Sequence, residues 1–245
     1  MKCDAKLMFQ RLELLAGSEG LEKLKQAKVL VFGLGGVGSW AAEALVRSGI
    51  GKIGLIDFDT VAESNINRQV QATSRTVGQA KAEIMRQRLL EINPDCEVTA
   101  WNRMFTRENA EEFTIKSADY VIDAIDTLNC KLDLIETCCA AEIPLFSSMG
   151  MAKKLDPTRI KIADIRETRG CPLARLVREG LRKRQFSGNF TTVYSDENIP
   201  QQGQEMQAET GQAGRKIING SIVTVTASAG MILASLVLRG IMERQ

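Results

Sequence analysis

The sequence has no histidine among its 245 residues. This absence excludes Ser-His-Asp and Cys-His nucleophilic sites, histidine-ligated metals and imidazole acid–base catalysis. The six cysteines include no C-x-x-C pair, so neither a four-cysteine zinc site nor a disulfide-stabilised secreted domain is indicated. Any chemistry must therefore use Asp, Glu, Lys, Arg, Cys or a bound ion.

Excess charge and long apolar runs are also scarce. The net charge of +2 is too small to indicate nucleic-acid binding by itself, although a local basic patch could do so. The first residues, MKCDAKLMFQRLE, lack the apolar stretch of a secretory signal, which predicts a cytoplasmic protein. The longest apolar run, residues 221–242, is diluted by Thr, Ser and Gly and closed by Arg239. We expect no membrane span there, but a buried strand followed by a helix that packs on the core or on a partner subunit.

Strand-like and helix-like patterns alternate along most of the chain, and the strands are apolar on both faces. This alternation predicts an α/β, Rossmann-like, doubly wound fold: a mainly parallel sheet with helices on both faces and a C-terminal strand-helix extension. The patterns predict strands at 28–33, 52–59, 97–101, 119–126, 143–150, 159–165 and 189–195, and helices at 6–15, 18–26, 38–49, 77–92, 107–116, 128–142 and 172–185.

The character of the chain changes after Gly150, where the regular alternation ends. We expect residues 1–245 to form a single domain, with a nucleotide-binding core at 1–150 and a substrate-binding, dimer-forming extension at 151–245. Residues 195–215 are polar, rich in Gln and poor in apolar side chains, which predicts a mobile loop.

The stretch VFGLGGVGSW joins a predicted strand to a predicted helix through closely spaced glycines. Gly33, Gly35 and Gly38 match the turn that brings a backbone against a phosphate at a helix N-terminus. Asp57 follows the next strand, 24 residues after Gly33, where an acidic residue can hold ribose hydroxyls. A nicotinamide or flavin dinucleotide and a nucleoside triphosphate both fit this pattern.

Downstream charge favours a triphosphate over a redox cofactor. Asn65 and Arg68 follow the second strand, and Lys81 follows at the start of a helix, so two cations and an amide could converge on the glycine turn. Each such charge-assisted hydrogen bond contributes roughly 1.5–3 kcal/mol. Asp126 ends the strand at 119–126, where a carboxylate could hold Mg²⁺ against phosphate oxygens. Asp57 and Asp126 could also merely cap strand ends, and Asp59 could cap a turn.

Five motifs together resemble the ubiquitin-activating-like adenylyltransferase superfamily in order and spacing: GLGGVGS, LIDFDTVAESNINRQ, VGQAKAE, INP and VIDAIDT. Within that superfamily, four segments resemble the tRNA threonylcarbamoyladenosine dehydratase branch: GGVGSWAAEALVRSGIG, PLARLVREGLRKR, VYSDE and GSIVTVTASAGMILASLVLRGIM. The superfamily motifs cover most of residues 1–150, and the branch resemblance covers nearly the whole chain.

The resemblance implies ATP-dependent adenylation of a carboxylate. It implies catalytic roles for Arg68, Lys81 and Asp126, with Mg²⁺ bound by Asp126. Because the arginine at the position of Arg68 typically reaches phosphates of the neighbouring subunit's site, the resemblance also implies a homodimer. The implied ATP-binding residues are Gly33, Gly35, Gly36, Gly38, Asp57, Asp59, Asn65, Arg68, Lys81, Asp126, Thr127 and Arg11.

In the dehydratase branch, the carboxylate belongs to the threonyl group of threonylcarbamoyladenosine in tRNA. Once adenylated, it is attacked from within the same side chain, the ring closes and AMP leaves, after the earlier release of pyrophosphate. The ring-closing nucleophile comes from the substrate, so neither a histidine nor a catalytic cysteine is needed. The resemblance therefore fits a chain without histidine.

A basic predicted helix offers a surface for tRNA phosphates. A charged stripe of this kind can also be merely solvated, and a tRNA contact should weaken steeply with salt. The candidate tRNA-binding residues are Arg175, Arg178, Arg182, Lys183 and Arg184.

Cys171 supports an alternative function. It stands close to where some superfamily members carry a thioester- or persulfide-forming cysteine, and it departs from the branch pattern, which has a less reactive residue there. The alternative is an adenylyltransferase that activates the C-terminal glycine of a ubiquitin-like sulfur carrier, working with a sulfur-transfer or cysteine desulfurase system. Without a histidine beside it, we expect Cys171 to be a neutral, partly buried thiol. An NAD-dependent oxidoreductase and a non-catalytic nucleotide sensor are further alternatives, but both leave Arg68, Lys81 and Asp126 without a role.

Overall fold

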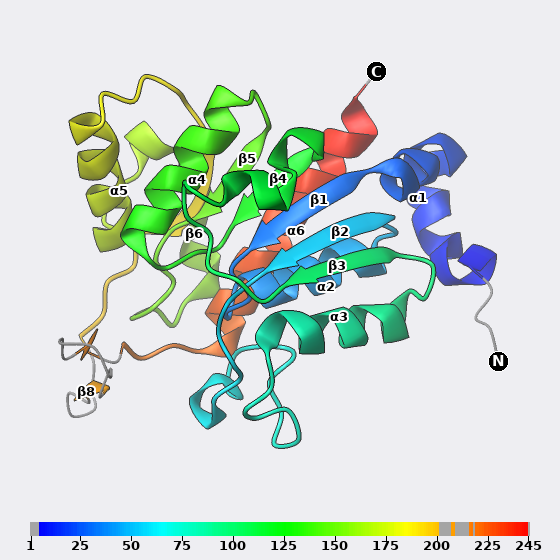
Figure 1. Cartoon of the computed structure of the whole chain (residues 1–245), viewed down its shortest axis with the longest axis horizontal. Coiled ribbons are helices and arrows are strands. Elements are labelled where there is room, and N and C mark those ends of the chain that lie inside the picture. The colour runs from blue at the N-terminus through cyan, green and yellow to red at the C-terminus, as the bar shows by residue number, and fades with distance from the viewer. Residues whose placement is uncertain (1–4, 201–206, 209–215, 218, 245) are drawn as a thin grey trace.

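The computed structural model describes residues 5–200, 207–208, 216–217 and 219–244. Its centre is a seven-stranded sheet with strand order β3-β2-β1-β4-β5-β7-β6 (Figure 1). Every neighbouring pair is parallel except β6 and β7. The predicted Rossmann-like α/β fold with a mainly parallel sheet is thereby confirmed. Strands from before and after Gly150 belong to the same sheet. The strands are β1 (Lys28–Phe32), β2 (Lys52–Ile56), β3 (Glu97–Trp101), β4 (Tyr120–Asp123), β5 (Leu145–Ser148), β6 (Ile160–Asp164) and β7 (Thr191–Ser195), with a separate pair β8 (Gln207–Ala208) and β9 (Lys216–Ile217).

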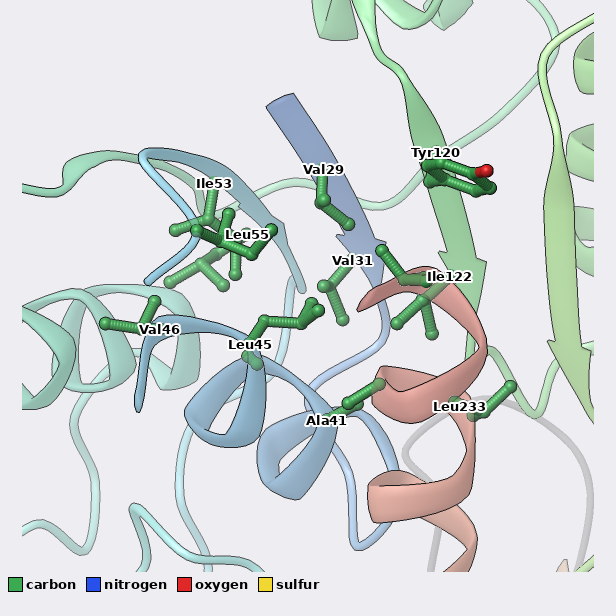
Figure 2. Packing of buried hydrophobic residues seen from close by; sticks show 14 of the residues in the cluster. Val29, Val31, Ala41, Leu45, Val46, Ile53, Leu55, Tyr120, Ile122 and Leu233 are labelled. Carbon is green, nitrogen blue, oxygen red and sulfur yellow. The ribbon is translucent and has the colours of Figure 1, made fainter. Parts of the chain in front are cut away.

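Two groups of helices cover the two faces of the sheet (Figure 1). One core cluster joins the sheet to α1, α2, α3 and α6, and the other joins it to α4, α5 and the short 3-10 turns at 110–117. Figure 2 shows the first cluster, where Val29 and Val31 of the sheet face Ala41 and Leu45 across the layer. The helices are α1 (Ala5–Gln26), α2 (Gly38–Arg47), α3 (Lys81–Ile92), α4 (Leu128–Ala140), α5 (Pro172–Lys183) and α6 (Val223–Glu243).

The predicted helix at 107–116 is wrong. The segment forms two 3-10 turns, Ala110–Phe113 and Ile115–Ser117, separated by Thr114 in the left-handed conformation at φ 50°. Phe113 and Ile115 are both buried although they are only two residues apart. An α-helix would point them away from each other, so packing against the sheet overrides helical propensity here.

The C-terminal apolar run contains no strand at its start, which corrects the expected strand before the helix. The chain is helical from Val223, despite the β-branched residues that favour a strand. The helix packs tightly on α2 at Gly230, where a Cβ would lie 2.5 Å from the Val37 carbonyl oxygen. Only a helix with glycine at this position can approach α2 so closely.

By length and composition, α6 could cross a membrane, with a mean hydropathy of 1.7 over its most apolar window. Within the protein, however, 44% of that window is buried. Its inward residues, among them Leu233 and Val237, belong to the core cluster shown in Figure 2. The helix is therefore an integral part of the layer that covers the sheet.

Candidate functional site

The glycine turn lies at the carboxyl edge of the sheet, between β1 and α2. Gly33 adopts φ 87°, and a Cβ there would lie 2.7 Å from the Ala124 carbonyl oxygen. A Cβ at Gly38 would lie only 1.8 Å from the Gly33 carbonyl oxygen. Apart from the chain neighbours of Gly35, no described residue has an atom within 4 Å of its Cβ position. The first and third glycines thus permit tight packing, and the middle one leaves its backbone open to a ligand.

Asp57 lies directly after β2 and holds the glycine turn in place. Its Oδ2 accepts a hydrogen bond from the Leu34 N–H at 2.6 Å, and its Oδ1 accepts one from the Asp59 N–H at 2.8 Å. Burial raises the pKa of Asp57, while the Lys81 charge and these backbone donors oppose the rise. Each carboxylate oxygen retains a second lone pair, so the group can still accept a ribose hydroxyl.

Lys81 begins α3 and lies beside the same turn. Its Nζ donates to Asp59 Oδ2 at 2.9 Å, and its side chain is only 7% exposed. The Lys81 backbone N–H also donates to the Asp59 carbonyl oxygen at 3.0 Å. Asp59 therefore fixes an ammonium group at the carboxyl edge, where an arriving phosphate would meet it.

Arg68 lies over the glycine turn of its own chain. A Cβ at Gly36 would lie 3.2 Å from Arg68 Cγ. Burial lowers the pKa of the Arg68 guanidinium, and the nearby Asp126 carboxylate opposes that shift. Asn65 holds the loop before the arginine: its Oδ1 accepts from the Ala62 N–H at 3.1 Å, and its carbonyl oxygen accepts from the Arg68 N–H. Asn65 thus shapes the loop that presents the arginine.

Asp126 and Thr127 follow β4, next to the glycine turn across the β1–β4 pair. Both side chains are exposed, and the Thr127 hydroxyl donates to Asp126 Oδ1 at 3.4 Å. Among the described residues, no three Cys, Asp or Glu side chains gather as a metal cluster. A single exposed carboxylate at this edge suits Mg²⁺, which is commonly held by one or two carboxylates together with substrate phosphates.

A buried polar group behind Asp126 escaped the sequence analysis. Lys131 Nζ lies 2.7 Å from Asp123 Oδ2, and both side chains are fully buried. The Ser147 hydroxyl also donates to Asp123 Oδ2, at 2.6 Å, and the Ile125 N–H donates to Asp123 Oδ1 at 3.0 Å. Asp123 thereby ties α4, β5 and the backbone leading to Asp126 together. The only sequence signal was a pair of opposite charges eight residues apart within apolar segments.

Gln71 is a second residue that the sequence did not reveal. Its Nε2 donates to the Leu34 carbonyl oxygen at 2.8 Å, which links the loop after β2 to the glycine turn. Its Oε1 is the one buried side-chain oxygen or nitrogen of the described residues without a hydrogen-bond partner. An unpaired acceptor of this kind beside a nucleotide turn fits a ligand that brings a donor.

Arg11 does not reach the glycine turn of its own chain. It lies on the exposed side of the first half of α1, before the kink at Gly17. This half packs at the amino edge, because a Cβ at Gly49, shortly before β2, would lie 3.6 Å from the Phe9 ring. Gly33 lies at the opposite edge, a strand length of about 16 Å away. Figure 1 shows α1 on the far side of the molecule from the loops that follow β1 and β4.

The basic residues of α5 divide into two groups. Arg184 Nη1 pairs with Asp133 Oδ1 at 2.6 Å and with Glu136 Oε2 at 3.0 Å, so its charge is neutralised by α4. Arg178 is half-buried and donates to the Thr168 hydroxyl. The expected five-residue stripe is therefore reduced to three exposed cations: Arg175, Arg182 and Lys183.

Cys171 is the N-cap residue of α5 and is 4% exposed. It belongs to the apolar cluster beneath α4 and α5. Its Sγ lies 3.7 Å from the Cβ position of Gly150, two strands away from β1 in the sheet. The thiol is more completely buried than expected, and the glycine turn does not lie beside it.

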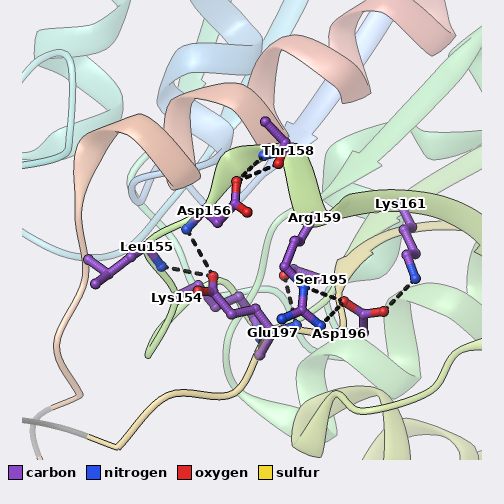
Figure 3. A network of polar contacts seen from close by, with 9 residues as sticks. All are labelled: Lys154, Leu155, Asp156, Thr158, Arg159, Lys161, Ser195, Asp196 and Glu197. Atoms are coloured by element: carbon purple, nitrogen blue, oxygen red, sulfur yellow. Dashed lines mark hydrogen bonds and ion pairs between the residues drawn. The ribbon is translucent and has the colours of Figure 1, made fainter.

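A polar network fastens the loop after β5 to the end of β7 (Figure 3). Glu197 Oε2 accepts from the backbone N–H groups of Leu155 and Asp156 at 2.9 and 3.0 Å. Lys154 is 4% exposed and donates to the Glu197 carbonyl oxygen. Beside it, Asp196 Oδ1 accepts from Arg159 Nη2 at 2.8 Å. The network fixes the chain at 154–161 and 195–197. Most of the Gln-rich segment 195–215 follows it and lies outside the described residues.

Comparison with known proteins identifies the family of the chain. A family model described as the ThiF family matches residues 9–245. The chain is 47% identical over 209 residues to a Bacillus subtilis tRNA threonylcarbamoyladenosine dehydratase, a match that covers 85% of this chain and 82% of the relative. It is 45% identical over 168 residues to the Escherichia coli K12 protein of the same name, covering 69% of this chain and 63% of that relative.

Two solved structures resemble the whole chain. Both are E. coli tRNA N6-threonylcarbamoyladenosine dehydratase, TcdA. The complex with ATP matches at a TM-score of 0.86 and 36% identity, and the complex with AMP at 0.87 and 35%. Each match covers 99% of this chain and 97% of that one.

Proposed function

Since the chain belongs to the ThiF family, we propose that it is an ATP-dependent enzyme that dehydrates and cyclises threonylcarbamoyladenosine in tRNA. One observation carries the proposal: a single turn at the carboxyl edge of the sheet has an open backbone at Gly35 and is surrounded by charged side chains. These side chains are Asp57, Lys81, Arg68 and Asp126. Ligands of open α/β sheets bind at this edge, where the strand order reverses. The similarity to ATP- and AMP-bound dehydratases over nearly the whole chain supports the assignment.

The proposed reaction has two steps. An oxygen of the threonyl carboxylate attacks the α-phosphorus of ATP, the bond to the β-phosphate oxygen breaks, and pyrophosphate leaves. A nucleophile of the same modified side chain then attacks the acyl carbon, the bond to AMP breaks, and the ring closes. The net change in the nucleoside is the loss of one water, while ATP becomes AMP and pyrophosphate.

The chain's own residues oppose the repulsion between two anions. Lys81 and Arg68 supply the positive charge, and the N-terminus of α2 adds N–H donors from the turn. Asp57 holds the Leu34 N–H and is the candidate for the ribose hydroxyls. Asp126 would hold Mg²⁺, which neutralises phosphate charge and stabilises the leaving pyrophosphate. Thr127 and Asn65 support the loops that present these groups.

A homodimer would complete the site, and the exposed face of α1 supports this part of the proposal. Arg11 shares that face with Leu7, Leu14 and Leu15, which are 68%, 85% and 87% exposed. Three exposed leucines around an arginine are typical of a surface that another protein covers. Arg68 serves its own chain's turn, so Arg11 is the better candidate for an arginine that acts across the subunit interface.

The remaining assignments complete the proposal. We assign the nucleotide-binding role to residues 1–150 and the contacts to tRNA to residues 151–245. The second subunit would contact both this extension and the exposed face of α1. The exposed cations of α5, Arg175, Arg182 and Lys183, would contact tRNA phosphates, and a cytoplasmic location suits that substrate. The sulfur-carrier alternative has a weak basis, because a protein-borne carboxylate could not reach the buried Cys171 thiol without rearrangement.

The test combines nucleotide and nucleoside measurements on the purified full-length chain. The protein is incubated with ATP, Mg²⁺ and tRNA that carries threonylcarbamoyladenosine, and AMP release is followed together with the nucleoside mass. AMP released in step with the loss of one water from the nucleoside supports the proposal. AMP formed only when a ubiquitin-like sulfur carrier is present would overturn it. Unmodified tRNA is the matched control and should release no AMP.

A further inference from the structure

A groove lies on the outer side of α5, at the β6 end of the sheet. It encloses about 420 Å³ between the second half of α5, the turn after β6 and the turn before β7. The candidate ATP site lies elsewhere: β6 is antiparallel to β7, so the end of β6 that enters the groove lies at the amino edge of the sheet. The residues that line it are Ile165, Arg166, Arg178, Leu181, Arg182, Gln185, Phe186 and Gly188.

The floor of the groove is apolar. Ile165 and Leu181 are 2% and 4% exposed, and Phe186 is half-buried beside them. A Cβ at Gly188 would lie 2.5 Å from Phe186 Cζ, so the absence of a side chain there leaves room for the aromatic ring. A flat, partly accessible ring above aliphatic side chains is a surface on which a nucleobase can stack.

The walls of the groove are cationic and carry no acidic residue. Three arginines line it, and none of them is paired with a carboxylate among the described residues. Arg166 Nη2 donates to the Ser187 and Gly188 carbonyl oxygens, both at 2.9 Å, and Arg178 donates to the Thr168 hydroxyl. Arg182 is exposed and has no side-chain partner within the described chain. Each guanidinium therefore keeps free N–H donors for a phosphate.

Gln185, the second residue after α5, also lines the groove. Gln185 ends α5 in the left-handed conformation, at φ 56°, while the Phe186 N–H donates to the Leu181 carbonyl oxygen at 3.0 Å. Glycine is the usual residue in this helix-ending position, because a side chain strains the backbone there. The protein instead has a long amide that lines the groove, and an amide can donate to and accept from base edges.

We propose that this groove binds a nucleotide of the tRNA at a distance from the modified adenosine. The base would lie on Phe186 and Leu181, and its phosphate would meet Arg182. The proposal rests on the proposed function for the identity of the RNA. Since α5 is 12 residues long, it extends about 18 Å between the two edges of the sheet. An anticodon arm that reaches the carboxyl edge could lie along this helix and occupy the groove at the same time.

The test is tRNA binding measured without ATP, by fluorescence anisotropy, for the wild type and for Arg182→Glu. Lys52→Glu is the matched control: Lys52 is also an exposed cation at the amino edge, but it starts β2, which is five strands from β6 in the sheet. Arg182→Glu should raise the Kd for tRNA at least fivefold and reduce its salt dependence, and Lys52→Glu should leave both nearly unchanged. The KM for ATP should stay the same in both variants, which shows that the catalytic edge is intact.

Two further experiments show whether the groove binds a nucleotide of tRNA or free AMP. Ultraviolet irradiation of the wild type bound to 4-thiouridine-substituted tRNA should cross-link the RNA to residues 178–188. In equilibrium dialysis, the wild type and Arg182→Glu should bind the same amount of AMP, because the groove itself should not bind free AMP. Three results would each overturn the proposal. One is an equal loss of tRNA affinity in Arg182→Glu and Lys52→Glu, the second is cross-links confined to the carboxyl-edge loops, and the third is an AMP site that is lost in Arg182→Glu. Dehydration by the wild type tests the enzyme assignment separately, so the two can fail independently.

Discussion

Gly35→Ala should separate nucleotide binding from folding. Apart from its chain neighbours, no described residue has an atom within 4 Å of the Cβ position. Gly35 is also not in the left-handed region, so alanine fits the backbone without strain. By restricting the unfolded chain, such a substitution stabilises a protein by about 0.4–1 kcal/mol. The new methyl group would nevertheless occupy the space through which a phosphate approaches the backbone of the turn.

The expected loss of ATP binding follows from the bonds that are blocked. A hydrogen bond from a backbone N–H to a charged phosphate contributes about 1.5–3 kcal/mol, and 1.4 kcal/mol corresponds to a tenfold change in affinity. The KM for ATP should therefore rise about 10- to 150-fold, with an unchanged or slightly higher melting temperature. Thermal unfolding with and without ATP, together with initial-rate kinetics, measures both quantities.

Gly38→Ala is the contrasting variant. A Cβ there would overlap the Gly33 carbonyl oxygen at 1.8 Å, so the turn itself must break and the melting temperature should fall together with ATP affinity. If Gly35→Ala kept its KM for ATP within twofold of the wild type, phosphate would not approach this backbone and the proposed site would be refuted.

Three other predictions concern buried polar groups and the Cys171 thiol. Lys131→Met should lower the free energy of unfolding by about 3–5 kcal/mol, because it leaves the fully buried Asp123 carboxylate unpaired, and adding Asp123→Asn should recover part of the loss in urea titrations. Burial disfavours the ionised form of Glu43, but the hydrogen bonds and charges of Arg88 and Arg47 outweigh the effect of burial. They hold the pKa of Glu43 below the ordinary value of 4.5. Its stabilisation is present above that pH and is lost as the pH falls through the lowered pKa, so Glu43→Gln should flatten the decline of melting temperature below about pH 5. Cys171→Ser should keep full dehydratase activity, and an inactive but folded variant would instead favour thiol chemistry.

Features that depend on neighbours in the chain were predictable. The glycine turn needs particular residues at fixed spacings because the backbone between Gly33 and Gly38 closes on itself, and Asp57 follows because the second strand ends beside that turn. Strand β3 was predicted with its observed bounds, Glu97–Trp101, since it alternates locally and is followed by a break. Lys81 was predicted at the start of a helix, and the helix begins there, although four residues later than its pattern suggested.

Features that depend on distant atoms were not predictable. The helix predicted at 107–116 gives way to 3-10 turns because Phe113 packs against Phe32 and Phe105 in one core cluster. Arg184, the C-cap residue of α5, is neutralised by carboxylates of α4 that lie about 50 residues earlier in the sequence. Nothing in the basic sequence pattern itself distinguishes Arg184 from Arg182.

By itself, the sequence determined the fold class, the glycine turn and the residue types that surround it, because these follow from periodicity, glycine sterics and short-range spacing. Only the tertiary structure decided which charges reach the turn. It placed Asp126 beside Arg68, took Arg11 to the opposite edge of the sheet, and buried the Asp123–Lys131 pair behind the site. The physical reason is that Coulomb and hydrogen-bond energies depend on separation and burial in space, and packing sets both.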